Sequence, residues 1–438
     1  MTIRINKRHV FCFFLMALMA LVLIRYGFQI NIPRTSITAV VILIALLGGK
    51  NEVLTIALCC IPLHNGLNFH VSVVVCAVIY VLKSGKKMRF NLSALLIIGM
   101  IMWELLHCFA AEFNLTLFLT SISPLIFLLI ILNSDVIDVG YAFVARVLSA
   151  ITICVSVALL LYCLIRANYD IIVMFANLQR LGSVSDDTAL FGSEVNPNSL
   201  GVVNVLAATS LLQIRHMGCK RKIDGILITL LLIFSLLTAS RTALICLIIM
   251  TISLLVGQRG KFVQKLRYGV AVIIIAAGTI AVYMRLFPES FAFFLSRFED
   301  SDVTGGRMNL FMDYNNYMKS NLQVIFLGVG LMNFGEKVTV IYNMAHAVPH
   351  NCIQEVIVAW GIPGLILVTL LIAVMIAQSK KYGTRKTLLN YIPLIILISK
   401  SMAGQFITSG YTMLALAFAY LSLCQDFTPT DRLDNTSL

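Results

Sequence analysis

Apolar runs of about 20 residues recur from one end of this chain to the other, and a transmembrane helix needs a run of that length. Hydrophobic residues make up 59% of the 438 residues and charged residues only 12%, whereas a soluble domain carries about 25% charged residues. The sequence therefore predicts an all-α polytopic membrane protein with about 12–14 transmembrane helices. The candidate spans are 9–28, 35–49, 52–63, 70–83, 91–110, 115–133, 141–166, 197–215, 224–239, 241–257, 267–287, 351–378, 388–406 and 409–425.

Two details of the N-terminal third need interpretation. No small-residue cleavage site follows the first run, so we expect a retained span rather than a signal peptide. The runs 35–49 and 52–63 are short, and they fit either a re-entrant pair or one broken span.

The 11 cysteines lie mostly inside apolar runs and show no CxxC pair, which predicts buried thiols rather than disulfides or a zinc site.

Lysine and arginine gather in short clusters between the spans, as in cytoplasmic loops of membrane proteins. With about 14 spans and the N-terminus inside, every cluster falls on the cytoplasmic face. The net charge of +13 therefore indicates topology rather than binding to nucleic acid. The clusters lie at 4–8, 83–89, 215–222, 259–267 and 380–386.

The same topology divides the chain and places both termini in the cytoplasm. Its longest polar interval is expected outside the membrane, partly helical, and it is where we expect the chemistry. The predicted divisions are N-terminal spans 1–166, an outer loop 167–196, central spans 197–287, a large extracytoplasmic catalytic loop 288–350, C-terminal spans 351–425 and a cytoplasmic tail 426–438.

Several arginines fall on the outer side, where the charge rule disfavours them. Long loops tolerate such charges, which is the plain explanation for Arg285 and Arg297. Arg241 is different, because it lies in a very short turn between two apolar runs. A guanidinium at that depth is costly unless it meets an anion. Arg180 and Arg307 also lie on this side, although a lone loop arginine such as Arg180 is a weak signal.

Two further patterns occur in the loop 288–350. A helix is predicted over about 307–320, followed by a tight turn at Leu327-Gly328-Val329-Gly330. Asp300 and Asp302 resemble the metal-binding pairs of nucleotide-sugar enzymes. Because nucleotide sugars are cytoplasmic and this loop is not, a solvated acidic turn is the better interpretation.

His350 directly precedes the span that begins near Asn351, so it is expected at a helix N-terminus. The helix dipole there favours the neutral imidazole, which can act as a general base. His346 lies four residues earlier, a spacing that binds zinc on a helix. Pro349 interrupts that spacing and no third ligand is evident, so no metal site is predicted.

Elsewhere, Asn196-Pro197-Asn198-Ser199 has the composition of a helix start, with a proline early and a capping side chain before it. Ionisable residues within spans are candidates for function. Here they are Glu104, His107 and Lys400. Lys400 either lies near a lipid phosphate or pairs with Glu104, and the sequence leaves both possibilities open.

Together, these motifs resemble the O-antigen polymerase and O-antigen ligase superfamily. The resemblance covers about residues 180–365 and rests on the order of short motifs. They are Asn196-Pro197-Asn198, Ser240-Arg241-Thr242, Ser296-Arg297, Gly306-Arg307, Gly328-Val329-Gly330, His350-Asn351 and Ala359-Trp360-Gly361-Ile362-Pro363-Gly364.

The resemblance implies a GT-C-like, metal-independent glycosyltransferase without a cofactor. It would act at the outer face of the bacterial inner membrane, on glycans carried by undecaprenyl pyrophosphate. By the same resemblance, Arg241 and Arg307 hold the pyrophosphate and His350 activates the acceptor. Arg180, Arg297, Asn351 and His346 are predicted to contact substrate. The expected partners are a lipid-linked donor and acceptor, the bilayer, a chain-length regulator and a flippase.

Three functions fit the sequence to different degrees. A polymerase joins lipid-linked repeat units of O-antigen or capsule, and we take this as the first hypothesis. A ligase would transfer the same glycan to a lipopolysaccharide core, and the motifs do not separate the two. A transporter of polysaccharide or small solutes would show an internal repeat and polar groups at the midplane, whereas no repeat is evident and the polar residues gather at the outer face.

Overall fold

The computed structural model describes residues 7–85, 90–109, 114–134, 140–178, 180–182, 195–257, 307–331, 348–382 and 386–426, with isolated positions between 270 and 296. Every regular element in these ranges is a helix. The helices are α1 (Lys7–Val22), η1 (Leu23–Gly27), α2 (Arg34–Leu47), α3 (Lys50–Leu63), α4 (Phe69–Ser84), α5 (Leu92–Phe109), α6 (Leu115–Leu132), α7 (Tyr141–Arg166), α8 (Ile171–Asn177), α9 (Pro197–His216), α10 (Lys222–Leu237), α11 (Arg241–Gly257), α14 (Arg307–Ser320), α15 (Leu322–Leu327), α16 (Cys352–Ser379), η5 (Lys380–Tyr382), α17 (Leu388–Met402) and α18 (Gly410–Cys424).

Helix length and composition confirm the predicted class. Four helices in the described ranges are long and apolar enough to cross a membrane, and shorter apolar helices accompany them. Large aliphatic side chains such as Leu46, Leu82 and Leu95 are exposed on the outside of the bundle, as expected where lipid replaces water. The chain is an all-α polytopic membrane protein. The four long helices are Arg8–Gly27, Leu92–Phe109, Tyr141–Arg166 and Cys352–Tyr382.

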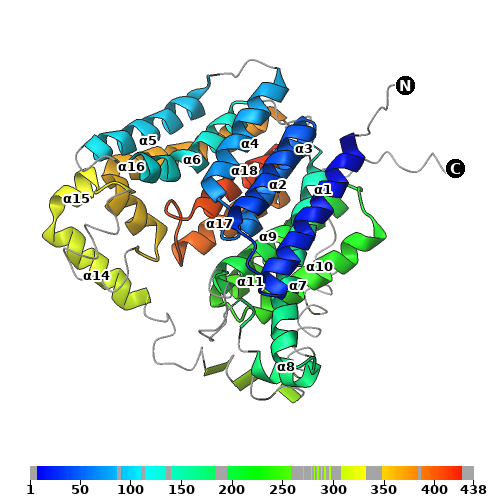
Figure 1. Cartoon of the computed structure of the whole chain (residues 1–438). Coiled ribbons are helices and arrows are strands. Elements are labelled where there is room, and N and C mark those ends of the chain that lie inside the picture. Colours follow the sequence, from blue (N-terminus) through cyan, green and yellow to red (C-terminus); the bar gives the residue numbers. More distant parts are fainter. Residues whose placement is uncertain are drawn as a thin grey trace, which may run out of the picture.

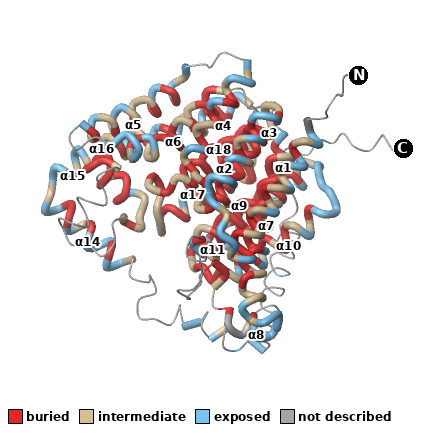
Figure 2. Tube along the Cα trace, viewed as in Figure 1, coloured by how far each residue is buried: buried red, intermediate tan, exposed pale blue. Residues whose placement is uncertain are grey.

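α18 and α9 form the centre of the bundle (Figure 1). Nearly every residue of α18 is buried, and α3, α6, α16 and α17 pack around it. α9 is buried over most of its length between α7, α10, α11 and α17. A helix that is apolar all round is expected in the interior, and Figure 2 shows these two helices among the buried segments. All 11 cysteines fall in described residues and are free thiols; seven are buried, as predicted, whereas Cys12 and Cys219 are exposed.

The short apolar runs 35–49 and 52–63, predicted as a re-entrant pair or one broken span, form two separate helices, α2 and α3. They join at Gly48 and Gly49 and pack on each other and on α4. Gly48 is held close, since a Cβ there would lie 2.8 Å from the Ile44 carbonyl oxygen. Each helix has 14 residues, which is shorter than a typical transmembrane helix.

α15 and α16 pack closely together at two glycines, Gly328 and Gly361, whose φ angles lie in the left-handed region. Gly328 has φ 81° and Gly361 has φ 67°, which kinks α16. Val329 N–H donates to Val358 O at 2.8 Å, and Gly330 N–H donates to Ala359 O at 2.8 Å. The glycine turn predicted from the sequence is therefore the surface that fits into the α16 kink.

Glu104 and His107 of α5 strengthen this junction. Glu104 Oε2 accepts from Trp360 Nε1 at 2.7 Å and from the Leu331 N–H at 3.0 Å. A His107 ring nitrogen lies 2.8 Å from Leu327 O. The possible pairing of Glu104 with Lys400 is wrong, because tertiary packing directs this carboxylate to the α15–α16 junction instead. Both residues have a structural role, which burial in an apolar span alone did not predict.

Gly361→Ala is expected to destabilise the protein strongly. Alanine at φ 67° costs about 1–3 kcal/mol in backbone strain, and its Cβ would lie 2.5 Å from Phe326 O. The measurement is thermal unfolding in detergent, followed by a thiol-reactive dye that reports exposure of the buried cysteines. Gly99→Ala is the matched control, because its Cβ would only contact Leu367 Cδ2 at 3.8 Å. Equal melting temperatures for the two variants would contradict the close packing of the glycine turn after α15 into the α16 kink.

Candidate functional site

Three cavities follow one another through the bundle, and each shares lining residues with the next. We call them the apolar groove, the cationic passage and the polar cavity, with volumes of about 460, 80 and 430 Å³. The groove and the passage share Arg307, His350 and Ala403. The passage and the polar cavity share Gln405 and Tyr411, among others. The three together form a continuous site.

The apolar groove lies between α11, α14 and the start of α16. Its aliphatic and aromatic lining is Leu244, Ile245, Ile248, Met308, Phe311 and Met402. Arg241, Arg307, His350 and Asn351 also line it. The groove is thus apolar along one side and cationic at one end, a combination that suits a lipid with an anionic headgroup.

Each of the three residues in the Ser240-Arg241-Thr242 motif has a different structural role. Ser240 Oγ accepts from the Ala243 N–H at 3.2 Å and so caps α11, and it donates to Asn198 Oδ1 at 2.9 Å. Ala239 before it has φ 46°, which closes the turn after α10. Arg241 then lines the groove, and Thr242 lines the passage. The very short turn places this guanidinium at the groove.

Arg307 begins α14, as the predicted helix boundary required. Its Nη1 donates to Thr242 Oγ1 at 3.5 Å, which joins α14 to the α11 terminus. The side chain lines both the groove and the passage. Arg307 is therefore the cation that lies where the apolar and polar parts of the site meet.

His350 lies just before α16, as predicted, and lines the same two cavities as Arg307. Asn351 is the N-cap of α16, where its side chain accepts from the Ile353 N–H at 3.0 Å and the Gln354 N–H at 3.3 Å. The cap fixes the end of the helix and, with it, the backbone that carries His350. Asn351 thus has a structural role in addition to its place in the groove lining.

Lys400 is a second cation in the described lining of the passage, after Arg307. Its side chain is only 6% exposed, and Nζ donates to Thr412 Oγ1 at 2.6 Å and to Gln405 O. The ammonium also lies 4.7 Å from the centre of the Tyr411 ring. These contacts fix the amine in the passage beside Arg307 and His350. The sequence left two possibilities for Lys400. The pairing with Glu104 is wrong, and a place beside a lipid phosphate remains a prediction.

Glu355 holds the segment 403–409, which lines the passage and the polar cavity. Its carboxylate accepts from the Phe406 N–H and from the Thr408 N–H and hydroxyl. It is fully buried and interacts electrostatically with Lys400. Sequence reasoning missed this residue. The signal was present, because Glu355 is an acid in the first turn of an apolar span.

The other arginine and histidine predictions fall in different places. Arg180 Nε donates to Thr238 O at 3.1 Å, and its Nη2 donates to Asn198 Oδ1 at 3.0 Å. Arg180 therefore contacts residues that support the site, and it does not line the three cavities. Arg297 and His346 lie outside the described residues, so their contact with substrate stays a prediction.

The Asn196-Pro197-Asn198-Ser199 segment is the helix start that was predicted. Asn196 is the N-cap of α9 and its side chain accepts from the Asn198 N–H at 2.8 Å, with Pro197 in the first turn. The same segment also enters the site, because Asn198 lines the passage and Ser199 lines both the passage and the polar cavity. The cap and the lining are therefore one structural unit.

No group of three His, Cys, Asp or Glu residues within the described ranges is arranged to hold a metal ion. The described lining of the groove and passage also lacks Asp and Glu, the residues that Mg²⁺ prefers. Its basic side chains are Arg241, Arg307, Lys400 and His350. Guanidinium groups among them suit the binding of an anion such as phosphate.

Comparison with known families matches part of the chain that contributes to the site. Residues 226–369 match the family model described as O-antigen ligase. The matched range contains Arg241, Arg307 and His350, and it confirms the resemblance to the O-antigen polymerase and ligase superfamily. It does not extend to Lys400 or to Tyr411 of the polar cavity. No curated protein matches the chain.

Proposed function

We propose that this chain is a glycosyltransferase of the O-antigen polymerase and ligase superfamily that uses a glycan carried on undecaprenyl pyrophosphate. The observation that carries the proposal is that Arg241, Arg307 and His350 line one groove, apolar on its other side. An apolar wall beside guanidinium groups fits a lipid pyrophosphate. We further propose that the reaction takes place at the outer face of the bacterial inner membrane, with both termini in the cytoplasm.

The arginines would provide electrostatic stabilisation of the leaving group. When the bond between the anomeric carbon and the pyrophosphate oxygen breaks, the electron pair stays on that oxygen. Arg241 and Arg307 can bind the resulting charge through charge-assisted hydrogen bonds, and Arg307 is held by Thr242 for this purpose. Undecaprenyl pyrophosphate then remains in the groove as the second product.

His350 would act as the general base. An acceptor hydroxyl in the passage gives its proton to the imidazole while its oxygen attacks the anomeric carbon. Attack opposite the leaving group forms the new glycosidic bond and inverts the anomeric configuration. The position of His350 at the boundary of groove and passage suits this role, because the donor phosphate and the acceptor hydroxyl must meet there.

The finer proposal is that the acceptor is a second lipid-linked repeat unit, which makes the protein a polymerase. The alternative is a ligase that uses a lipopolysaccharide core. The matching family is described as O-antigen ligase, and the match supports the two functions equally. Interaction with a chain-length regulator and a flippase remains a prediction under either proposal.

The test uses full-length protein in nanodiscs and the lipid-linked repeat unit extracted from the source strain, with EDTA present. A polymerase is expected to produce a ladder of longer glycans without a divalent metal. In parallel reactions, lipopolysaccharide core is added as the acceptor. Transfer to the core without a ladder would identify a ligase instead. No transfer to either acceptor by folded protein would refute both proposals and favour the transporter hypothesis.

A further inference from the structure

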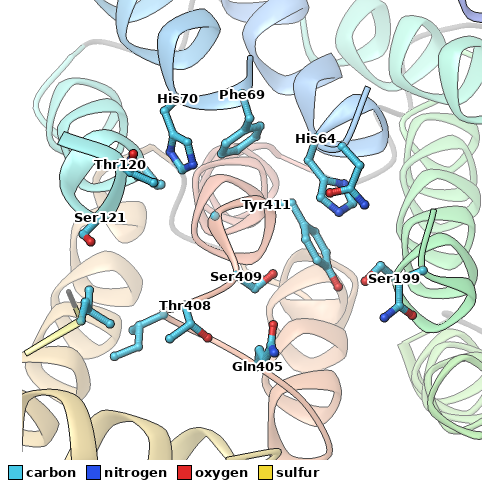
Figure 3. A pocket seen from close by; sticks show the side chains of 16 residues that line it. His64, Phe69, His70, Thr120, Ser121, Ser199, Gln405, Thr408, Ser409 and Tyr411 are labelled. Carbon is cyan, nitrogen blue, oxygen red and sulfur yellow. The ribbon is translucent and has the colours of Figure 1, made fainter. Parts of the chain in front are cut away.

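The polar cavity lies beyond the groove and the passage, and all of its described lining except Leu331 falls outside the range that the family match covers. It is enclosed by the α3–α4 turn, α6, the start of α9, the segment 405–409 and the start of α18 (Figure 3). Its volume of about 430 Å³ is in the range of ligand sites, about 300–1,000 Å³. The roles of Arg241, Arg307 and His350 in the proposed transfer do not account for a space of this size.

The lining of this cavity is polar but uncharged in its described residues, apart from the imidazoles. Hydroxyl and amide side chains provide its hydrogen-bonding groups: Thr120, Ser121, Ser199, Gln405, Thr408 and Ser409. Aromatic faces come from Phe69 and Tyr411. Hydroxyls, amides and aromatic rings without Asp, Glu, Lys or Arg suit a neutral, hydroxyl-rich ligand better than an ion or a phosphate.

Tyr411 supplies the most specific observation. Its side chain is 4% exposed, and its hydroxyl is buried without a hydrogen-bond partner among the residues that the structure describes. A buried donor of this kind normally has a partner, and leaving it unsatisfied is costly. Figure 3 shows the ring extending from α18 with its hydroxyl toward Gln405 and Ser199. The unsatisfied group therefore points to a ligand in the cavity.

The Tyr411 ring is held in this orientation by its neighbours. The His64 ring packs against it with 4.6 Å between ring centroids, and the Lys400 ammonium lies 4.7 Å from its centre. His64 Nδ1 is 2.9 Å from Ile61 O. Burial lowers the pKa of His64 to about 4, so this imidazole is neutral at physiological pH. A fixed aromatic ring with an available hydroxyl is a suitable contact for a sugar ring.

We propose that the polar cavity is a carbohydrate subsite that binds a sugar residue of a lipid-linked glycan, with the Tyr411 hydroxyl as a hydrogen-bonding contact. The proposal rests on the proposed function, because it extends the same continuous site. A glycan that begins at the pyrophosphate near Arg307 can continue through the passage into this cavity. The sugar belongs either to the donor or to the acceptor, and the two sources share the same chemistry.

The test compares two probes that differ only in the glycan. Undecaprenyl pyrophosphate and the undecaprenyl-pyrophosphate-linked repeat unit are bound to full-length protein, and each Kd is measured by native mass spectrometry. The Kd of undecaprenyl pyrophosphate divided by the Kd of the linked repeat unit gives the contribution of the glycan to binding. Tyr411→Phe is expected to reduce that ratio by about three- to tenfold, as for one lost hydrogen bond, and to leave the Kd of undecaprenyl pyrophosphate unchanged.

Two further variants make the result interpretable. Tyr420→Phe removes a hydroxyl from the same helix away from the cavity lining, and it is expected to leave the ratio unchanged. Thr120→Trp fills the cavity from α6 and is expected to reduce the ratio further. If Thr120→Trp does not fold, Tyr411→Phe still decides the question, because it keeps the ring.

The outcomes distinguish a subsite for the donor glycan, a subsite for the acceptor glycan and the absence of a carbohydrate subsite. A reduced binding ratio in Tyr411→Phe assigns the cavity to the donor glycan. An unchanged ratio with a KM for the acceptor raised three- to tenfold assigns it to the acceptor glycan. If neither quantity changes, the carbohydrate subsite is refuted. If wild-type protein binds neither probe more tightly than Arg307→Ala does, the proposed function itself fails.

Discussion

Arg307→Ala is expected to lower kcat for glycan transfer by about 10²–10³-fold, the loss seen when one preorganised donor to a developing oxyanion is removed. The guanidinium lies where the groove and the passage meet and is held by Thr242. Arg307→Lys keeps the charge but loses the planar fork that binds phosphate oxygens. It is expected to recover only part of the activity. Initial rates at saturating lipid-linked substrate measure both effects.

Arg180→Ala is the matched control for this prediction. The sequence predicts Arg180 as one of five outer-face arginines and as a substrate contact, but the structure places it against Thr238 O and Asn198 rather than in the cavities. We expect a lower melting temperature and a far smaller loss of kcat than for Arg307→Ala. If Arg180→Ala lost as much kcat as Arg307→Ala while staying folded, the special role of Arg307 would be contradicted.

Local signals in the sequence predicted the helices well where the chain contains caps and glycines. The Asn196-Pro197 pair marked the start of α9, and Arg307 marked the start of α14. The boundary before α16 placed His350 correctly at a helix terminus. These features depend on residues close together in the chain, which a sequence shows directly.

The remainder of the site depends on contacts between distant residues. Glu355 reaches the segment around Phe406 and Thr408, more than 50 residues later. Tyr411 faces a cavity that includes His64 and Thr120 from the N-terminal helices. A single sequence does not show such contacts, because α18 and α3 read only as apolar runs. For the same reason Glu104 was grouped with Lys400, although it bonds Trp360.

The continuity of the three cavities gives each part of a lipid-linked glycan a separate chemical environment. The apolar groove suits the polyprenyl chain, the cations suit the pyrophosphate, and the uncharged polar cavity suits a sugar. Only the middle part requires charge. This fits the concentration of arginine and lysine around Arg307, whereas hydroxyls, amides and two imidazoles are found in the described lining of the cavity beyond.

His350→Ala is expected to lower kcat by about 10²–10⁴-fold, the contribution typical of a positioned general base. Binding of undecaprenyl pyrophosphate should change little, because the arginines remain. His107→Ala is the matched control. Its imidazole contacts Leu327 O at the α5–α15 contact and lies outside the three cavities, so it should cost stability rather than rate. Single-turnover transfer rates and Kd values measure the two effects separately. A His350→Ala enzyme with near-normal kcat would exclude His350 as the base and leave the arginines as the main catalytic groups.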